Sequence, residues 1–177
     1  SAELEIRGVD VGRGMWSMHS IRETCGSADT PLMIRAMRRQ KKRILRETAG
    51  TGLVPIRANS LDHECGSHVM FTFATAEKAV AMKEAMKAGF ITANTGRHIY
   101  TEWDQVFAHK GGSHPALNPF NFKENKHCRM RYTKTMCAKS LDILGRTIAF
   151  PTHPKRTDAE VTAFIRKLKD AARVVLG

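Results

Sequence analysis

Residues 67–73 have the sequence SHVMFTF, in which apolar and polar side chains alternate with the period of a half-buried β-strand. Thr75 follows in the position of a helix N-cap, and residues 76–87 predict a helix that ends near Gly89. The buried face of this helix is expected to contain Ala79, Met82 and Met86. Residues 90–92, Phe-Ile-Thr, predict a second short strand. A strand, a helix and a strand in such close order indicate an α/β unit.

The C-terminal part of the chain continues this alternation of helices and strands. We expect a helix over residues 132–144 that ends at Gly145, and then a strand over residues 147–150 that Pro151 closes. Residues 157–160, Thr-Asp-Ala-Glu, have the pattern of a capping box. The helix that follows carries a sustained apolar stripe made of Val161, Phe164, Ile165, Leu168, Ala172 and Val175.

The N-terminal part contains one predicted helix, over residues 31–48, and no regular pattern is visible before it. Asp29 and Thr30 are candidate caps, and Pro31 suits the first helical position. The helix has one acidic residue, Glu47, and a set of basic ones: Arg35, Arg38, Arg39, Lys41, Lys42, Arg43 and Arg46. It therefore holds about half of the net charge of +12.

Length and composition limit the class of protein. A chain of 177 residues with 42% hydrophobic residues is long enough for one domain with a core of its own. No apolar run approaches the length of a membrane-spanning helix, so we expect no membrane partner. Four cysteines without a framework spacing favour a reducing compartment, and we expect a cytoplasmic protein.

Residues 94–130 show no sustained period and are rich in Asn, Gly, His and Pro, which is typical of a functional loop. We expect substrate contacts from Arg97, His98, Tyr100 and Trp103. Aromatic faces with donors suit a sugar ring, an imidazole can relay a proton, and a guanidinium can hold a phosphate or carboxylate in two places. The alternative for Trp103 and Tyr100 is that they only anchor the loop.

Several motifs for other chemistry are weak or missing. His63, Glu64, Cys65 and His68 lack the spacing of a zinc site, so we assign no metal. The run at residues 110–114, KGGSH, lacks the strand and the spacing of a phosphate loop. For the basic helix we favour a solvated cationic face over nucleic-acid binding.

Blocks of sequence over residues 30–177 resemble, in order, the C-terminal part of the DegT-type sugar aminotransferases. Residues 32–48 are similar to the long helix that leaves the large domain of that family, and residues 65–92 are similar to the opening of its small domain. Residues 97–107 resemble its substrate loop. Residues 137–160 resemble its closing pattern of a helix, a short strand with a Pro-x-x-Pro ending and a capped final helix.

The resemblance implies the small C-terminal domain of the aspartate-aminotransferase fold, with a short, mostly antiparallel sheet, helices on one face and a long basic helix before it. Residues 1–50 would be an irregular segment and linking helix, and residues 51–177 the α/β small domain. The implied function is to close over a keto-sugar and orient it during amino transfer from an amino acid, with pyridoxal phosphate as cofactor. A homodimer is expected.

Two departures from the family pattern limit what is carried over. The family has a phosphate-contact motif ahead of the long helix, whereas this chain has Met-Trp-Ser-Met at residues 15–18, without Asn or Arg. No lysine lies in a matching context for a Schiff base, so we expect the chain to be inactive by itself. The alternative function is a stand-alone basic α/β module that binds nucleic acid or another polyanion.

Overall fold

The computed structural model describes residues 28–128 and 131–177. This part of the chain contains five α-helices, four strands and five short 3₁₀ helices. The α-helices are α2 (Asp29–Glu47), α3 (Ala76–Met86), α4 (Asp104–Phe107), α5 (Ala138–Gly145) and α6 (Asp158–Leu176). The strands are β1 (Val54–Pro55), β2 (His68–Thr72), β3 (Phe90–Ile91) and β4 (Thr147–Pro151). The 3₁₀ helices are η1 (Gly96–His98), η2 (Tyr100–Glu102), η3 (Pro115–Leu117), η4 (Pro119–Asn121) and η5 (Lys123–Asn125).

The four strands form one antiparallel sheet in the order β1-β2-β4-β3. The longest pairing joins β2 to β4, with Phe71 opposite Ile148 and Val69 opposite Phe150. β3 pairs with the other edge of β4, so β4 lies between the two strands that α3 connects. This is a split β-α-β arrangement. It makes β4 an inner strand, paired on both of its sides.

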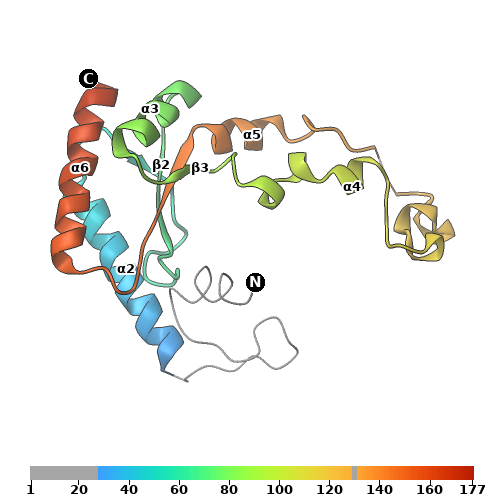
Figure 1. The fold of residues 1–177 in the computed structure, drawn as a ribbon, viewed down its shortest axis with the longest axis horizontal. Helices are drawn as coiled ribbons and strands as arrows, with labels where there is room; N and C mark the ends of the chain where they lie inside the picture. Colours follow the sequence, from blue (N-terminus) through green and yellow to red (C-terminus); the bar gives the residue numbers. More distant parts are fainter. Residues whose placement is uncertain (1–27, 129–130) are drawn as a thin grey trace.

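One hydrophobic core joins the sheet to the three helices that pack on it, α2, α3 and α6 (Figure 1). The largest fully buried side chains include Phe71 and Phe150 from the strands, Met82 from α3, Ile44 from α2 and Leu168 from α6. Because Ile44 belongs to this core, α2 packs against the sheet along its C-terminal half. Most of its basic residues lie away from the core, whereas Lys41, with 15% of its side chain exposed, pairs with Glu64 at 2.7 Å.

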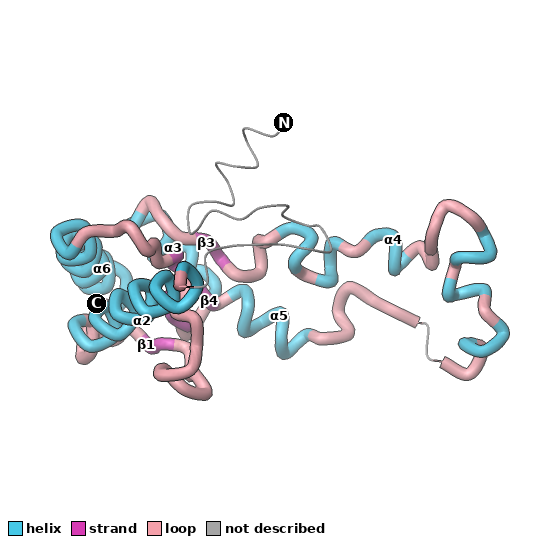
Figure 2. The backbone as a smooth tube through the Cα atoms, turned by 90° about the horizontal axis from the view of Figure 1, so that it is seen from below, coloured by secondary structure: helices cyan, strands magenta, loops and turns pink. Residues whose placement is uncertain are grey.

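Residues 96–128 and 131–137 form an arm that extends far from the sheet and its three packed helices (Figures 1 and 2). The arm consists of α4, the five 3₁₀ helices and connecting segments, and η2, α4, η3, η4 and η5 contain no buried residue. A stacked pair, His109 and Phe120, has a ring-centroid distance of 4.5 Å, and Tyr132 packs edge-on against both rings. The arm therefore depends on local contacts rather than on the core.

Most of the predicted elements are confirmed, and two boundaries are wrong. α2 begins at Asp29 after Ala28, whose side chain makes no cap hydrogen bond, so Asp29 is not the cap. Pro31 is tolerated as the third helical residue because the first four N–H groups of a helix have no intrahelical acceptor. The helix expected over residues 132–144 is shorter, since α5 begins at Ala138.

The α/β class and the antiparallel sheet are confirmed, while the narrower assignment to the aspartate-aminotransferase fold is not confirmed. Residues 1–27, including the Met-Trp-Ser-Met segment, lie outside the described residues. Among the helices of the described part, none combines the length and the apolar character needed to cross a membrane.

Candidate functional site

The basic residues of α2 form rows along the helix because their spacing follows its turns. Arg35, Arg39, Arg43 and Arg46 recur at intervals of four, four and three residues, which places them on one side of the helix. Arg39 and Arg46 are well exposed, with 77% and 75% of their side-chain surface accessible. This side of α2 therefore presents guanidinium groups to solvent one helical turn apart.

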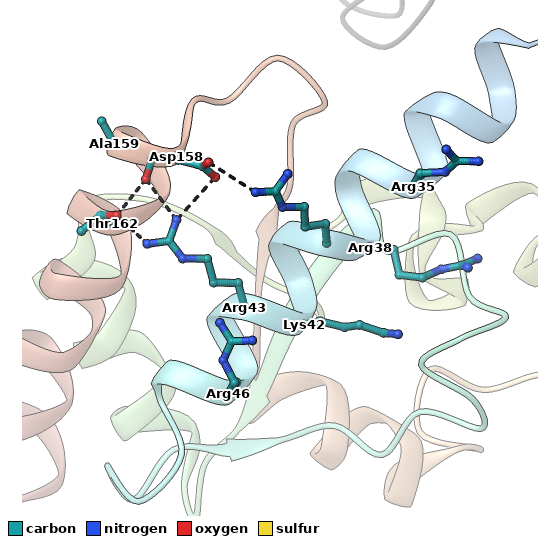
Figure 3. A pocket seen from close by; sticks show the side chains of 9 residues that line it. Arg35, Arg38, Lys42, Arg43, Arg46, Asp158, Ala159 and Thr162 are labelled. Carbon is teal, nitrogen blue, oxygen red and sulfur yellow. Dashed lines mark hydrogen bonds and ion pairs between the residues drawn. The ribbon is translucent and has the colours of Figure 1, made fainter.

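An open cleft of about 830 Å³ lies between this side of α2 and the first turns of α6 (Figure 3). We call it the cationic cleft, and it is lined by Arg35, Arg38, Arg39, Lys42, Arg43, Arg46, Asp158, Ala159 and Thr162. Six of these nine residues are basic and one is acidic. The balance gives the cleft a strongly positive potential.

The N-terminus of α6 forms one wall of the cleft and adds to its positive character. Thr157 accepts a hydrogen bond from the Glu160 N–H, and the Glu160 carboxylate accepts one from the Thr157 N–H, so the predicted capping box is present. These backbone and side-chain hydrogen bonds from Thr157 hold the pKa of Glu160 below its usual value. The dipole of this 19-residue helix has its positive end at Asp158.

Arg43 connects the two walls of the cleft. Its Nη2 donates to Thr162 Oγ1 at 2.6 Å, its Nη1 donates to the Asp158 carbonyl at 3.2 Å, and its Nε donates to Glu47 at 2.8 Å. The hydrogen bond from Arg43 is also the main reason why the pKa of Glu47 is lowered. Figure 3 shows Arg43 pointing toward α6, where its guanidinium is fixed in place.

Asp158 is the one carboxylate in the lining of the cleft, and it meets two of the guanidinium groups. Its side-chain oxygens lie 3.4 Å from Arg39 Nη2 and 3.6 Å from Arg43 Nη1. The Asp158 side chain is 74% exposed, so these are weak surface ion pairs. A stronger anion can compete with Asp158 for both arginines.

The other row of basic residues on α2 has partners in the loop before β2. Arg38 donates to the Glu64 carbonyl through Nε at 2.9 Å and through Nη2 at 2.7 Å, and Lys42 bonds to Asp62. Figure 3 shows Arg38 and Lys42 pointing away from Asp158 and Thr162. The exposed cations on the side toward α6 are therefore Arg35, Arg39 and Arg46, beside the fixed Arg43. Arg39 and Arg46 form weak ion pairs, with Asp158 at 3.4 Å and with Glu47 at 3.7 Å.

The residues expected to contact substrate lie elsewhere, in the first part of the arm. His98 and Trp103 are exposed, and the Arg97 side chain lies outside the described part of the chain. Tyr100 donates to the Lys134 carbonyl at 2.8 Å and accepts from the Cys137 N–H at 3.2 Å, so it joins the two ends of the arm. The described lining of the cationic cleft includes none of the four.

The cleft was not predicted, although both of its walls were. The basic helix and the capped final helix are visible in the sequence, yet Arg43 and Thr162 are 119 positions apart. Asp158 and Thr162 carry no sequence signal of their own beyond the capping box. Their role follows only from the packing of α2 beside α6.

Fold and site together define a small basic α/β domain with a cationic cleft between two helices. Residues 1–39 are similar to the family described as aminopeptidase I zinc metalloprotease (M18). The match covers less than a quarter of the chain, and only its last part, from residue 28, is described by the structure. No curated protein matches the chain.

This match contradicts the expected aminotransferase. It points to a different family, with zinc rather than pyridoxal phosphate, so the assignment to the DegT family, to amino transfer on a keto-sugar and to that cofactor is wrong. The physical reason lies in the motifs that carried the resemblance. A capping box, a short strand that ends at Pro151 and a helix that ends near Gly145 stabilise many α/β domains, and here they do so for α6, β4 and α5.

Zinc chemistry also finds no support in the part of the chain that the structure describes. A zinc site needs three or more side chains that converge on one point. Residues 28–128 and 131–177 contain no group of three or more His, Cys, Asp or Glu that could hold a metal ion. The described residues therefore do not fit the metal that the matched family is named for.

Proposed function

We propose that this domain binds a small phosphate-bearing ligand in the cationic cleft. The observation that carries the proposal is the row of four arginines on one side of α2, Arg35, Arg39, Arg43 and Arg46, in a cleft that has one carboxylate in its lining and ends at the N-terminus of α6. Guanidinium groups bind phosphate oxygens in pairs, and a helix N-terminus favours the same charge. Two independent sources of positive potential thus support one class of ligand.

The lining of the cleft favours a small ligand over nucleic acid. Carboxylates lie among the cations, with Asp158 in the lining, Glu47 on Arg43 and Asp62 on Lys42. They would repel a continuous row of phosphates. Single strands are also held by stacking on aromatic side chains, and the described lining contains none. A compact anion instead needs only Arg39, Arg43 and Arg46, where it competes with no more than two carboxylates, Asp158 and Glu47.

The test is calorimetric titration with methyl phosphate at low salt. The double variant Arg39→Gln/Arg46→Gln removes two exposed guanidinium groups, so the fold should persist. We expect it to bind at least tenfold more weakly than the wild type, a loss of about 1.4 kcal/mol.

The matched control is Lys78→Gln/Lys123→Gln, which removes two exposed charges from α3 and from the arm. It lowers the net charge by the same amount and should bind like the wild type. Equal weakening in both variants would show only a general charge effect and would refute the cleft as the site. The proposal would also be refuted if the wild-type protein bound a single-stranded DNA 20-mer but did not bind methyl phosphate.

A further inference from the structure

A second cavity adjoins the cationic cleft and shares residues with it. This adjoining pocket has a volume of about 230 Å³ and lies between α2 and the segment that leads into α6. Arg39, Arg43 and Asp158 line both spaces. A single ligand that contacts these shared arginines can therefore extend into the pocket.

The pocket differs in chemistry from the cleft. Its lining includes the apolar residues Ala36 and Pro154, the almost wholly buried Val161 and Gln40, and the polar residue Arg156. Arg156 is itself held over the ring of Phe164, 5.4 Å from its centroid. Apolar walls beside flat guanidinium groups suit a planar ring, because guanidinium stacks on ring faces.

The volume of the pocket also fits a single ring. A cavity of roughly 150 Å³ is large enough to hold benzene. The adjoining pocket is larger, and Arg39 and Arg43, which would hold a phosphate, line it as well as the cleft. An ester of phosphate with one flat ring would thus fill both spaces.

We propose that the ligand of the cleft is a phosphomonoester whose organic part is a flat ring seated in the adjoining pocket. This inference rests on the proposed function, and it adds the class of organic group. The phosphate contacts Arg39 and Arg43, and the ring lies against Ala36 and Pro154, which are both partly exposed. Transfer of the ring from water to these walls adds affinity beyond that of the phosphate alone.

The experiment compares phenyl phosphate with methyl phosphate by calorimetric titration of the wild-type chain. The two compounds have the same charged group and differ only in the organic part. We expect phenyl phosphate to bind at least tenfold more tightly. Equal affinities would overturn the inference while the proposed function stands, whereas no binding of either compound would overturn both.

A variant pair then locates the ring. Ala36→Leu fills the pocket from α2 with a residue that favours helix, so the gain for phenyl phosphate should disappear while methyl phosphate binds within twofold of the wild type. Ala163→Leu places the same group on α6 outside both spaces and should keep the full gain. A gain that survives in Ala36→Leu would place the ring elsewhere and overturn the inference. The wild-type comparison remains decisive if Ala36→Leu does not fold.

Discussion

The buried amide of Gln40 forms a reciprocal pair of hydrogen bonds with the backbone of His153. Its Nε2 donates to the His153 carbonyl at 2.5 Å, and its Oε1 accepts from the His153 N–H at 3.3 Å. Only 7% of Gln40 is exposed. The pair ties α2 to the segment between β4 and α6, and so it sets the distance between the two walls of the cationic cleft.

Replacement of Gln40 should therefore destabilise the whole domain. Gln40→Ala leaves the N–H and carbonyl of His153 without these partners, and an unsatisfied buried polar group costs about 1–3 kcal/mol. We expect the free energy of unfolding, measured in urea, to fall by that amount. Gln105→Ala removes an exposed amide in α4 and should change the free energy of unfolding by less than about 0.5 kcal/mol. A Gln40→Ala variant as stable as the Gln105→Ala control would contradict the role of this contact.

Two glycines with nearly the same backbone conformation should respond differently to alanine. Gly89 and Gly50 have φ of 78° and 79°. A Cβ at Gly89 would lie 2.7 Å from Phe150 Cδ1 and 2.8 Å from the Ala149 carbonyl, whereas a Cβ at Gly50 would have no atom within 4 Å. Gly50→Ala should lower the free energy of unfolding by about 1–2 kcal/mol, because alanine is strained in the left-handed backbone conformation.

Gly89→Ala should lower the free energy of unfolding by about 1–3 kcal/mol more than Gly50→Ala does, because the packing of β4 must shift. Thermal unfolding of both variants measures the difference. Equal losses in the two variants would mean that β3 and α3 can move away from Phe150 without strain.

The capping box of α6 should make stability depend on pH in acid. The pKa of Glu160 is lower in the folded chain than its usual value of 4.5, mainly because the Thr157 N–H bonds to its carboxylate. A lowered pKa contributes stability above the usual value, and that contribution is lost as the pH falls through the folded value. We expect the melting temperature to fall from pH 5 toward pH 3, and to fall less in Glu160→Gln. An unchanged slope in that variant would show that other carboxylates, such as Asp62 and Glu47, account for it.

The sequence predicts those elements whose burial repeats with a regular period. Val69, Phe71 and Phe73 alternate as the strand pattern requires, and all three are buried. The apolar stripe of α6 and its capping box are likewise confirmed. A local pattern was sufficient in these places because local preference and tertiary packing agree.

Tertiary contacts explain why residues 132–137 are not helical. The Lys134 carbonyl and the Cys137 N–H bond to the hydroxyl of Tyr100, so these backbone groups do not enter a helix.

The cationic cleft could not be predicted from local sequence patterns, because it too depends on tertiary contacts. Its two walls are distant in sequence and meet through contacts such as that between Gln40 and His153. A periodic pattern contains no information about which helices become neighbours.

The hydroxyl of Tyr100 should hold together the first and last segments of the arm. In Tyr100→Phe the ring keeps its contact with Phe107, but the hydroxyl that joins Lys134 and Cys137 is missing. We expect faster hydrogen exchange at the Cys137 amide, with a global loss of stability of about 0.5–1.5 kcal/mol at most. Tyr132→Phe, which keeps its ring contacts with His109 and Phe120, should leave exchange at Cys137 unchanged. Unaltered exchange at the Cys137 amide in Tyr100→Phe would show that other contacts hold these two segments of the arm together.

The central claim is that a phosphate group binds between α2 and the first turn of α6. The most direct test is a series of ¹H–¹⁵N correlation spectra of the labelled chain with methyl phosphate added to ~10 mM, ten times a dissociation constant of ~1 mM. Saturable shifts at the amides of Asp158 and Ala159 and at the Nε–H groups of Arg39 and Arg43 are the predicted result. Shifts confined to the lysines and arginines of the arm, or no saturable shift at the cleft, would contradict the account.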